Sequence, residues 1–156
     1  MTSLQRGGGH LVDLTTRECL ELLETCKVGR VAWCGAAGAT VIPVNYVLHD
    51  SAVWIRSTPY SMLARESTGE QMAFEVDGVD EFTRSGWSVL VRGRAERRSP
   101  AELPRDLPEV ETWPEGPRPF VLSIDLRGVT VFSAWWSGTG QAQHTLGVVR
   151  GGQDGA

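Results

Sequence analysis

The stretch Trp87-Ser88-Val89-Leu90-Val91-Arg92-Gly93-Arg94-Ala95-Glu96 decides the fold class of this chain of 156 residues. From Trp87 to Ala95 every second residue is apolar or glycine, and most of the residues between them are polar or charged. A period of two indicates a strand that buries one face and exposes the other. We therefore predict that residues 87–96 form a half-buried strand with Trp87, Val89 and Val91 on one face.

Short apolar and β-branched runs on both sides of this strand predict a mainly β fold. These runs are residues 28–34, 40–48, 52–57, 71–77 and 120–132, the last being a strand pair or one long bent strand. Turn residues at 35–38 and 49–51 separate the first three runs, which favours an antiparallel meander. Pro43 cannot donate a backbone hydrogen bond, so it marks an edge, a bulge or a break that faces a ligand.

Three short helices are expected between the strands. Leu14, Thr15 and Glu18 form a capping box preceded by an apolar residue, which predicts a helix at 16–25. Further helices are expected near 60–66 and, after Ser99-Pro100, near 100–106. Six or so strands with two or three small helices indicate a compact barrel over residues 13–136, between flexible glycine-rich tails at 1–12 and 137–156.

The composition is typical of a soluble globular protein, with 41% hydrophobic and 22% charged residues. No apolar run is long enough to span a membrane and no signal peptide is visible, so we expect a cytoplasmic protein. The net charge of −4 argues against nucleic-acid binding. Lys27 is the single lysine, so an anion would be held mainly by arginine, hydroxyl or backbone N–H groups.

The cysteines and histidines suggest neither a disulfide frame nor a metal site. Cys19, Cys26 and Cys34 are odd in number and form no CxxC pair, which indicates reduced thiols. The three histidines are far apart and lack metal-ligand spacing, although a haem held by one histidine stays open. No order of Ser, His and Asp, or of Cys and His, indicates nucleophilic catalysis, so the catalytic residues stay unknown.

Arg56, Ser57, Thr58 and Ser61 place one guanidinium and three hydroxyls near the expected start of the second helix. Free N–H groups and the helix dipole favour an anion there, such as the phosphate or pyrophosphate of a cofactor. The alternative is that Ser61 only caps the helix and that Arg56 is solvated. Both interpretations stay open at this point.

Four blocks of sequence, in this order, resemble the pyridoxamine 5′-phosphate oxidase-like, flavin-binding split-barrel superfamily, including its actinobacterial, nitroimidazole-reductase-like members. The blocks are Gly29–Ala32, Ile42–Tyr46, Ile55–Pro59 with Ser61, and Arg84–Glu96. The resemblance spans about residues 14–132. It implies a six-stranded antiparallel split β-barrel that forms a homodimer, with a flavin in the groove between the two subunits.

The resemblance also implies a set of cofactor-binding residues. The phosphate would be held by Arg56, Ser57, Thr58 and Ser61. The flavin ring would lie against one strand and approach a neighbouring strand, through Pro43, Val44, Asn45 and Tyr46 on the first and Trp87 and Ser88 on the second. FMN is the first expectation, FAD or a deazaflavin coenzyme are alternatives, and haem comes after these.

The chain departs from the family pattern at several positions. Met62 stands where the family prefers a lysine, and losing such a charge-assisted contact weakens binding by about 1.5–3 kcal/mol; this favours the alternatives to FMN. Tyr60 replaces a preferred glycine. Trp135 and Trp136 stand where relatives place arginines, and could stack on a ring or anchor a dimer interface.

The function implied is a flavin- or deazaflavin-dependent reductase of a small conjugated or aromatic molecule. The C-terminal Arg-x-His-Asp-Arg-type motif of true pyridoxamine phosphate oxidases is absent, so vitamin B6 oxidation is not expected. The alternative is a non-catalytic module that holds a flavin, a haem or another flat ligand at the dimer interface.

Overall fold

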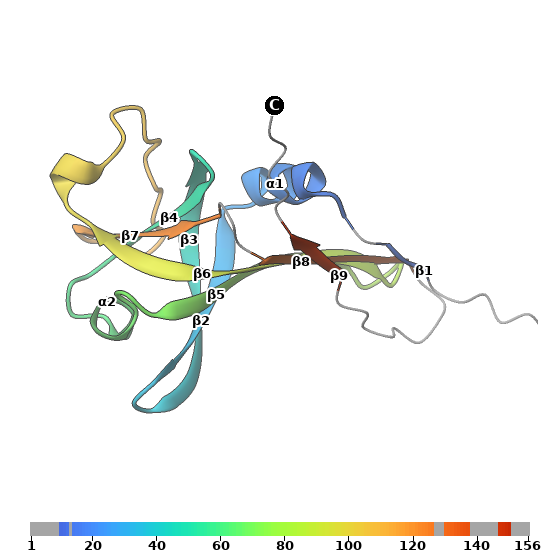
Figure 1. The fold of residues 1–156 in the computed structure, drawn as a ribbon, viewed down its shortest axis with the longest axis horizontal. Coiled ribbons are helices and arrows are strands. Elements are labelled where there is room, and N and C mark those ends of the chain that lie inside the picture. The colour runs from blue at the N-terminus through green and yellow to red at the C-terminus, as the bar shows by residue number, and fades with distance from the viewer. Residues whose placement is uncertain (1–9, 13, 127–129, 138–146, 151–156) are drawn as a thin grey trace, which may run out of the picture.

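The computed structural model describes residues 10–12, 14–126, 130–137 and 147–150 (Figure 1). Six strands form a closed antiparallel barrel, which confirms the predicted fold. They are β2 (Val28–Gly35), β3 (Gly38–His49), β4 (Ala52–Ser57), β5 (Gln71–Asp80), β6 (Ser85–Arg98) and β7 (Phe120–Asp125). The strands follow the order β6-β5-β2-β3-β4-β7, and a pairing of β7 with β6 closes the ring.

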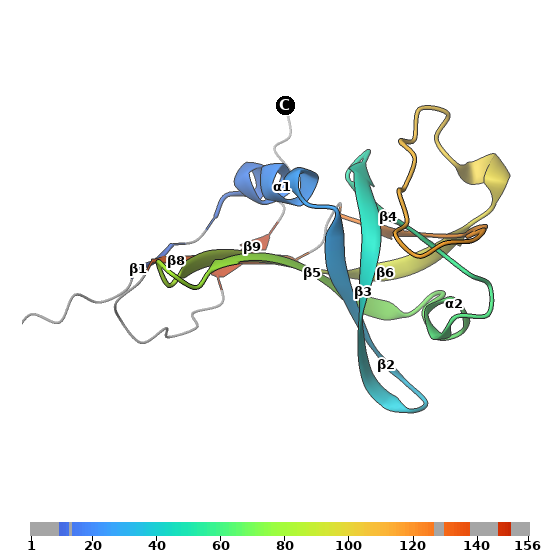
Figure 2. The ribbon, with the colours of Figure 1, turned by 180° about the vertical axis from the view of Figure 1, so that it is seen from behind.

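Strand β6, which contains the stretch that decides the fold, joins the barrel to an extension of the sheet. One edge of β6 pairs with β5. The other edge pairs first with β8 (Thr130–Ser137), through Gly86–Val91, and then with β7, through Ala95–Arg98. The reverse view in Figure 2 shows the extension projecting to one side of the barrel.

Two strands lie in stretches that the sequence predicted as tails. β1 (His10–Val12) and β9 (Gly147–Arg150) both pair with β8. The region expected as a strand pair or a bent strand at 120–132 is two strands, β7 and β8, which both pair with β6. The helix expected at 100–106 is a single 3₁₀ turn at Pro100–Glu102.

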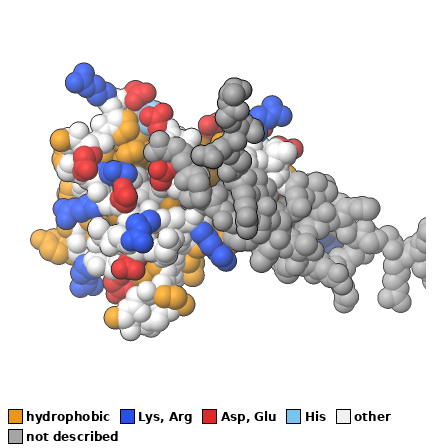
Figure 3. All heavy atoms as spheres, viewed as in Figure 1, with side chains coloured by type: hydrophobic (Ala, Val, Ile, Leu, Met, Phe, Trp, Pro, Cys, Tyr) orange, Lys and Arg blue, Asp and Glu red, His pale blue; other side chains and the backbone are white. Residues whose placement is uncertain are grey.

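Charged side chains of both signs are interspersed over the face of the barrel that Figure 3 shows. No helix among the described residues is long and apolar enough to cross a membrane.

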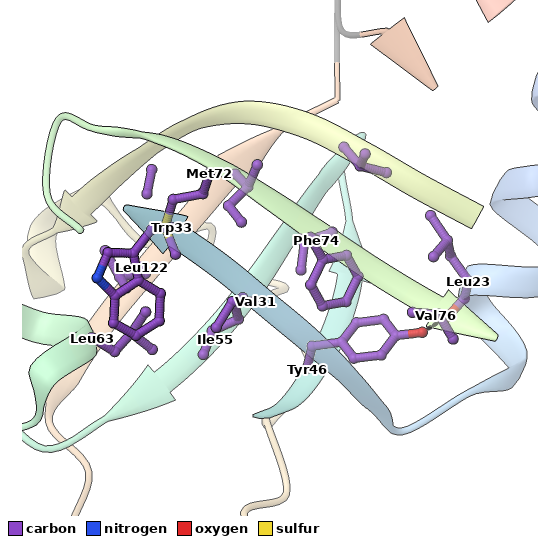
Figure 4. Close-up of a cluster of buried hydrophobic side chains, with 14 of the residues drawn as sticks. Leu23, Val31, Trp33, Tyr46, Ile55, Leu63, Met72, Phe74, Val76 and Leu122 are labelled. Carbon is purple, nitrogen blue, oxygen red and sulfur yellow. Dashed lines mark hydrogen bonds between the residues drawn. The ribbon is translucent and has the colours of Figure 1, made fainter. Parts of the chain in front are cut away.

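The barrel interior is filled by apolar side chains from all six strands. Figure 4 shows this cluster running from Leu23 and Tyr46 at one end to Trp33 and Leu63 at the other. Toward the Leu23 end, the rings of Tyr46 and Phe74 meet edge to face, with centroids 4.8 Å apart. On β6 the predicted faces are confirmed, because Val89 and Val91 are buried whereas Arg92, Arg94 and Glu96 are exposed.

Helices α1 (Thr16–Thr25) and α2 (Met62–Glu66) supply the end residues of this cluster. The capping box forms as predicted: the Glu18 carboxylate accepts from the N–H of Thr15, and the N–H of Glu18 donates to the Thr15 hydroxyl. The helix then directs Cys19 and Leu23 into the core. On α2, Glu66 accepts a 2.8 Å hydrogen bond from the indole N–H of Trp33.

The connection between β6 and β7, residues 99–119, folds back over the outer face of β3, β4 and β7. A second apolar cluster fixes it there. The cluster contains Ala52, Trp54, Val110 and Val121, with Val47, Leu103 and Leu107 packed against them. Two polar contacts add to it: the imidazole Nε2 of His49 lies 3.2 Å from a carboxylate oxygen of Asp106, and the N–H of Trp113 donates to Asn45.

Gly29→Ala should lower the free energy of unfolding by about 1–3 kcal/mol, because the added methyl group overpacks the core. The new Cβ would lie 2.5 Å from ring atoms of Phe74, which is fully buried. Urea denaturation measures the change. The double variant Gly29→Ala/Phe74→Leu is the control: its loss should be smaller than the sum of the two single losses, because the clash involves the ring. If the two single losses in free energy of unfolding simply add in the double variant, the proposed clash with the Phe74 ring is wrong.

Glu18→Gln should reduce stability more at pH 7 than at pH 3. Hydrogen bonds from the backbone and hydroxyl of Thr15 lower the pKa of Glu18 in the folded chain. The ionised carboxylate therefore stabilises the folded state above its unfolded pKa, and this contribution disappears as the pH falls through the folded value. Urea denaturation of both proteins at pH 7 and pH 3 checks it. If the two proteins differ in free energy of unfolding by the same amount at pH 7 and at pH 3, the charge of Glu18 does not contribute to stability.

Candidate functional site

The candidate site lies on the outer face of β4, under the 99–119 connection. The side chains of Val53 and Ile55 point into the core, so the alternate residues Trp54 and Arg56 point outward. Arg56 lines a cavity of about 470 Å³ between β4 and the connection. The other lining residues all come from the connection: Leu107, Pro108, Glu109, Val110, Thr112, Gly116 and Arg118.

Arg118 brings a second guanidinium to the same cavity. It stands between Pro117 and Pro119, and its Nε is buried without a hydrogen-bond partner. Leaving such a donor unpaired costs about 1–3 kcal/mol. The Arg56 guanidinium also makes no hydrogen bond or ion pair with the described residues. Among the described lining residues, two permanent positive charges face one carboxylate, that of Glu109, which makes this cavity suitable for an anion.

The serine hydroxyls that were predicted to bind the same anion as Arg56 make hydrogen bonds to other groups of the chain. Ser57 Oγ donates to Ser61 Oγ at 2.8 Å, and Ser61 Oγ donates to the carbonyl of Thr58 at 2.9 Å. Ser61 also accepts from the N–H of Ala64, so it caps α2. None of these three residues lines the cavity. Of the predicted phosphate-binding group, Arg56 alone reaches the cavity, and Ser61 serves as the helix cap.

The four predicted residues of β3 divide between two faces. Pro43 is exposed and Asn45 is half-buried on the outer face, whereas Val44 and Tyr46 pack against the core. Tyr46 is 2% exposed and its hydroxyl donates to the carbonyl of Leu23, so its side chain is closed to a ligand. Burial raises the pKa of Tyr46 far above its usual value. The side chains of Val44 and Tyr46 therefore belong to the core, and a contact of these two residues with a flavin stays a prediction for their backbone groups.

Asn45 and Arg56 each directly adjoin the pair that Tyr46 of β3 forms with Ile55 of β4. Both ends of the Asn45 amide are already occupied within this chain. Its Oδ1 accepts a 2.9 Å hydrogen bond from the N–H of Trp113, and its Nδ2 donates to the carbonyl of Lys27 at 3.3 Å. Asn45 therefore holds the connection that carries Arg118, which is a different role from the predicted hydrogen bond to a flavin ring.

Trp87 and Ser88 lie far from this cavity along β6. Arg98, at the other end of β6, pairs with Val121, which in turn pairs with Arg56. Trp87 precedes Arg98 by eleven positions, or roughly 36 Å of straight strand at ~3.3 Å per residue. Moreover, β5 and β2 separate β6 from β3, so the two predicted ring-binding strands are not neighbours within one chain. The side chains of Trp135 and Trp136 lie outside the described part.

A second, mainly apolar cavity of about 520 Å³ opens on the outer face of β2, β3 and β5. Its apolar lining includes Ala32, Val41, Met72 and Ala73. Ala32 pairs with Val41, and the next outward pair along these strands is Arg30 with Pro43. The cavity therefore adjoins Pro43, on the same face of β3 as Asn45.

The charged residues next to this cavity are paired with one another. Arg30 contacts both Glu75 and Asp77, at 3.3 and 2.6 Å. The hydrogen bond to Asp77 raises the pKa of Arg30, and burial is the main cause that raises the pKa of Glu75. No group of three or more His, Cys, Asp or Glu residues in the described ranges could hold a metal ion.

Sequence reasoning missed Arg118. The available signal was an arginine held between two prolines in a loop, which limits its backbone freedom. That signal does not reveal which strand the loop covers.

Tyr46→Phe should lower the free energy of unfolding by about 1–2 kcal/mol and leave flavin affinity unchanged. The hydroxyl satisfies a carbonyl in the last turn of α1, which has no partner within the helix. Urea denaturation and flavin titration measure the two effects. Tyr60→Phe, at an exposed position, is the matched control and should change neither. Unchanged stability with weakened flavin binding would return Tyr46 to the site.

Comparison with known proteins identifies the family of this chain. The sequence profile described as pyridoxamine 5′-phosphate oxidase matches residues 15–130. An uncharacterized protein of Mycobacterium tuberculosis, Rv0080, is 32% identical over 127 residues, covering 78% of this chain and 84% of the relative.

Solved structures share the fold at lower identity. An FAD-binding protein from Mycobacterium smegmatis superimposes with a TM-score of 0.67 at 23% identity, covering 81% of this chain and 99% of that one. An FAD- and haem-binding protein from the same species has a TM-score of 0.57 at 15% identity, covering 90% and 83%. On the match of the family profile to most of its length, the chain belongs to the pyridoxamine 5′-phosphate oxidase family.

Proposed function

We propose that this protein binds a flavin on the outer face of β3 and β4 and uses it to reduce a small conjugated or aromatic molecule. One observation carries the proposal: Arg56 and Arg118 line one cavity, and the buried Nε of Arg118 has no partner. Two similar structures are of proteins described as binding FAD, which supports a flavin as the ligand.

The residues present fit the anionic tail of such a cofactor. A guanidinium offers several N–H donors in a planar fork that matches phosphate oxygens. An acceptor bound in the cavity would satisfy the orphaned Nε of Arg118 and neutralise charge at Arg56. The position where the family prefers lysine is occupied by Met62, which is 41% exposed at the first residue of α2. Arg118 therefore supplies a cation that Met62 does not.

The outer face of β3 offers a surface for the ring. The apolar cavity beside Pro43 has the size and lining of a small-molecule pocket. Ala32, Val41 and Ala73 would pack against a flat ring and exclude water from it. Asn45 and Pro43 connect this cavity to Arg56 along the same face.

When bound, a flavin supplies the hydride or electron transfer itself. The chain's residues then bind and orient it: Arg56 and Arg118 fix the anionic end, and Asn45 holds the connection through Trp113. This division of roles accounts for a charged cavity with no His, Cys or Tyr among the described residues that line it.

A homodimer forms part of the proposal. Within one chain Trp87 and Ser88 lie at the far end of β6 from Arg56, so a second copy would be needed to bring them near the cofactor. The small-molecule substrate, the electron donor class and the expected cytoplasmic location stay predictions from sequence, as does the lack of nucleic-acid binding.

The second candidate is a binding module without turnover. The charged cavity contains Glu109 as its only carboxylate among the described lining residues, which suits holding a ligand as well as reacting with one. A haem bound through His49 is disfavoured, because its Nε2 already faces Asp106 at 3.2 Å and Asp50 at 3.6 Å. Oxidation of NADH or NADPH with a dye acceptor by the flavin-loaded protein separates an enzyme from a carrier.

Arg56→Ala should weaken flavin binding about ten-fold or more, because it removes a charge-assisted contact to the phosphate. Titration of the wild-type protein and the variant with FMN, FAD and a deazaflavin coenzyme measures this. Arg105→Ala is the matched control, since Arg105 is an exposed residue of the same connection and does not line the cavity. Equal affinity of wild type and Arg56→Ala would remove Arg56 from the site. A wild-type protein that binds no flavin at all would overturn the proposed function.

A further inference from the structure

We propose that Glu75, on the outer face of β5, is the acid that delivers a proton to the substrate in the reduction proposed above. This role rests on the proposed function, because a proton has to be delivered only where a substrate is reduced. It concerns a cluster of three charged residues, Arg30, Glu75 and Asp77, that is separate from the cavity at Arg56.

Glu75 lies at the edge of the apolar cavity of β2, β3 and β5. Its neighbours Phe74 and Val76 are fully buried and point into the core (Figure 4), so Glu75 points to the outer face. Ala73, the preceding residue on that face, lines the cavity together with Ala32, with which it pairs. The Glu75 carboxyl therefore borders the surface on which the flavin ring is proposed to lie.

One guanidinium is shared by two carboxylates in this cluster. Arg30 contacts Asp77 at 2.6 Å and Glu75 at 3.3 Å. With both carboxylates ionised, the three groups carry one excess negative charge, which a single proton neutralises. Asp77 makes the shorter contact, so Glu75 is the carboxyl that takes up this proton with the smaller loss of ion pairing.

The surroundings of Glu75 also favour its protonated form. Its side chain is 29% exposed, and burial raises the pKa of Glu75, an effect that Arg30 opposes and Asp77 increases. On β6, the residue opposite Glu75 is the uncharged Leu90, and Arg92 follows two positions later on the same face. A carboxyl with a raised pKa is better suited than an ordinary one to act as a general acid near neutral pH.

The proton transfer balances without a further reactant. Reduction adds a hydride and a proton to the conjugated molecule, and the hydride with its electron pair comes from the reduced flavin of the proposed function. The O–H bond of Glu75 breaks as the proton bonds to a substrate atom, and the electron pair of that bond stays on the carboxylate. Arg30 then stabilises the carboxylate, and solvent water, which reaches the partly exposed side chain, restores the proton.

The test measures how fast the flavin-loaded full chain, reduced with dithionite, passes electrons to two acceptors in single-turnover experiments. Menadione, a small conjugated quinone, takes up protons on reduction, whereas ferricyanide takes up electrons alone. Glu75→Gln should slow menadione reduction about 100-fold or more and leave ferricyanide reduction unchanged. Glu81→Gln, at an exposed glutamate in the turn between β5 and β6, is the matched control and should behave as the wild type with both acceptors.

The pH dependence distinguishes a proton donor from a structural residue. Menadione reduction by the wild type should fall as the pH rises through the folded pKa of Glu75, because the ionised carboxylate has no proton to give. Asp77→Asn should move this fall to lower pH, because Asp77 raises the pKa of Glu75. In the flavin-free protein, carbon NMR of the carboxyl groups should show one glutamate that titrates above the usual range and that is missing from Glu75→Gln.

The outcomes separate this role from the proposed function. Equal menadione rates in the wild type and Glu75→Gln, or equal slowing with both acceptors, would overturn the role of Glu75 and leave flavin-dependent reduction intact. A wild-type spectrum without the raised glutamate titration would overturn it as well. A wild-type protein that does not reduce menadione would overturn the proposed function, and this role with it. Urea denaturation shows whether each variant folds; if Glu75→Gln does not, the pH profile of Asp77→Asn and the glutamate titration of the wild type decide.

Discussion

The backbone hydrogen bonds along one edge of β6, first to β8 and then to β7, are the constraint on which the rest of the structure depends. Ala95–Arg98 pair with β7 and so close the barrel, and Gly86–Val91 pair with β8 and so extend the sheet beyond it. Because β6 and β7 are consecutive strands of the barrel and adjacent in it, the connection at 99–119 has both ends on the same side. It can therefore fold over the outer face of β3, β4 and β7.

That covering connection builds the candidate site. The apolar cluster of Trp54, Val110 and Val121 fixes the connection against the barrel. Arg118 is then carried to a position beside Arg56, where its Nε is buried without a partner. Packing of apolar side chains thus stabilises an arrangement that leaves two cations together, an unfavourable feature unless an anion binds. Such a local conflict is what a functional site is expected to show.

Local patterns in the sequence were reliable where a single element decides the outcome. The period of two over residues 87–96 predicted which face of β6 is buried, and Thr15 with Glu18 predicted the bounds of α1. Local patterns did not decide the contacts of a side chain where two elements compete for the same group. Tyr46 follows Asn45 in a block typical of flavin-binding strands, yet alternation along β3 sends its ring into the core, where Phe74 and the end of α1 receive it. Ser61 offered two uses, and the cap of α2 took its hydroxyl.

By itself, the sequence determined the mainly β barrel, its strands and helix caps, and Arg56 as the cation at the end of β4, because periodicity and capping are set by residues a few positions apart. The tertiary structure decided that Asn45 binds Trp113, 68 residues further along, and that Arg118 joins Arg56. The conformation of the 99–119 connection has no repeating pattern of its own. It is set by the apolar surface that the closed barrel presents, and that surface exists only after the strands have assembled.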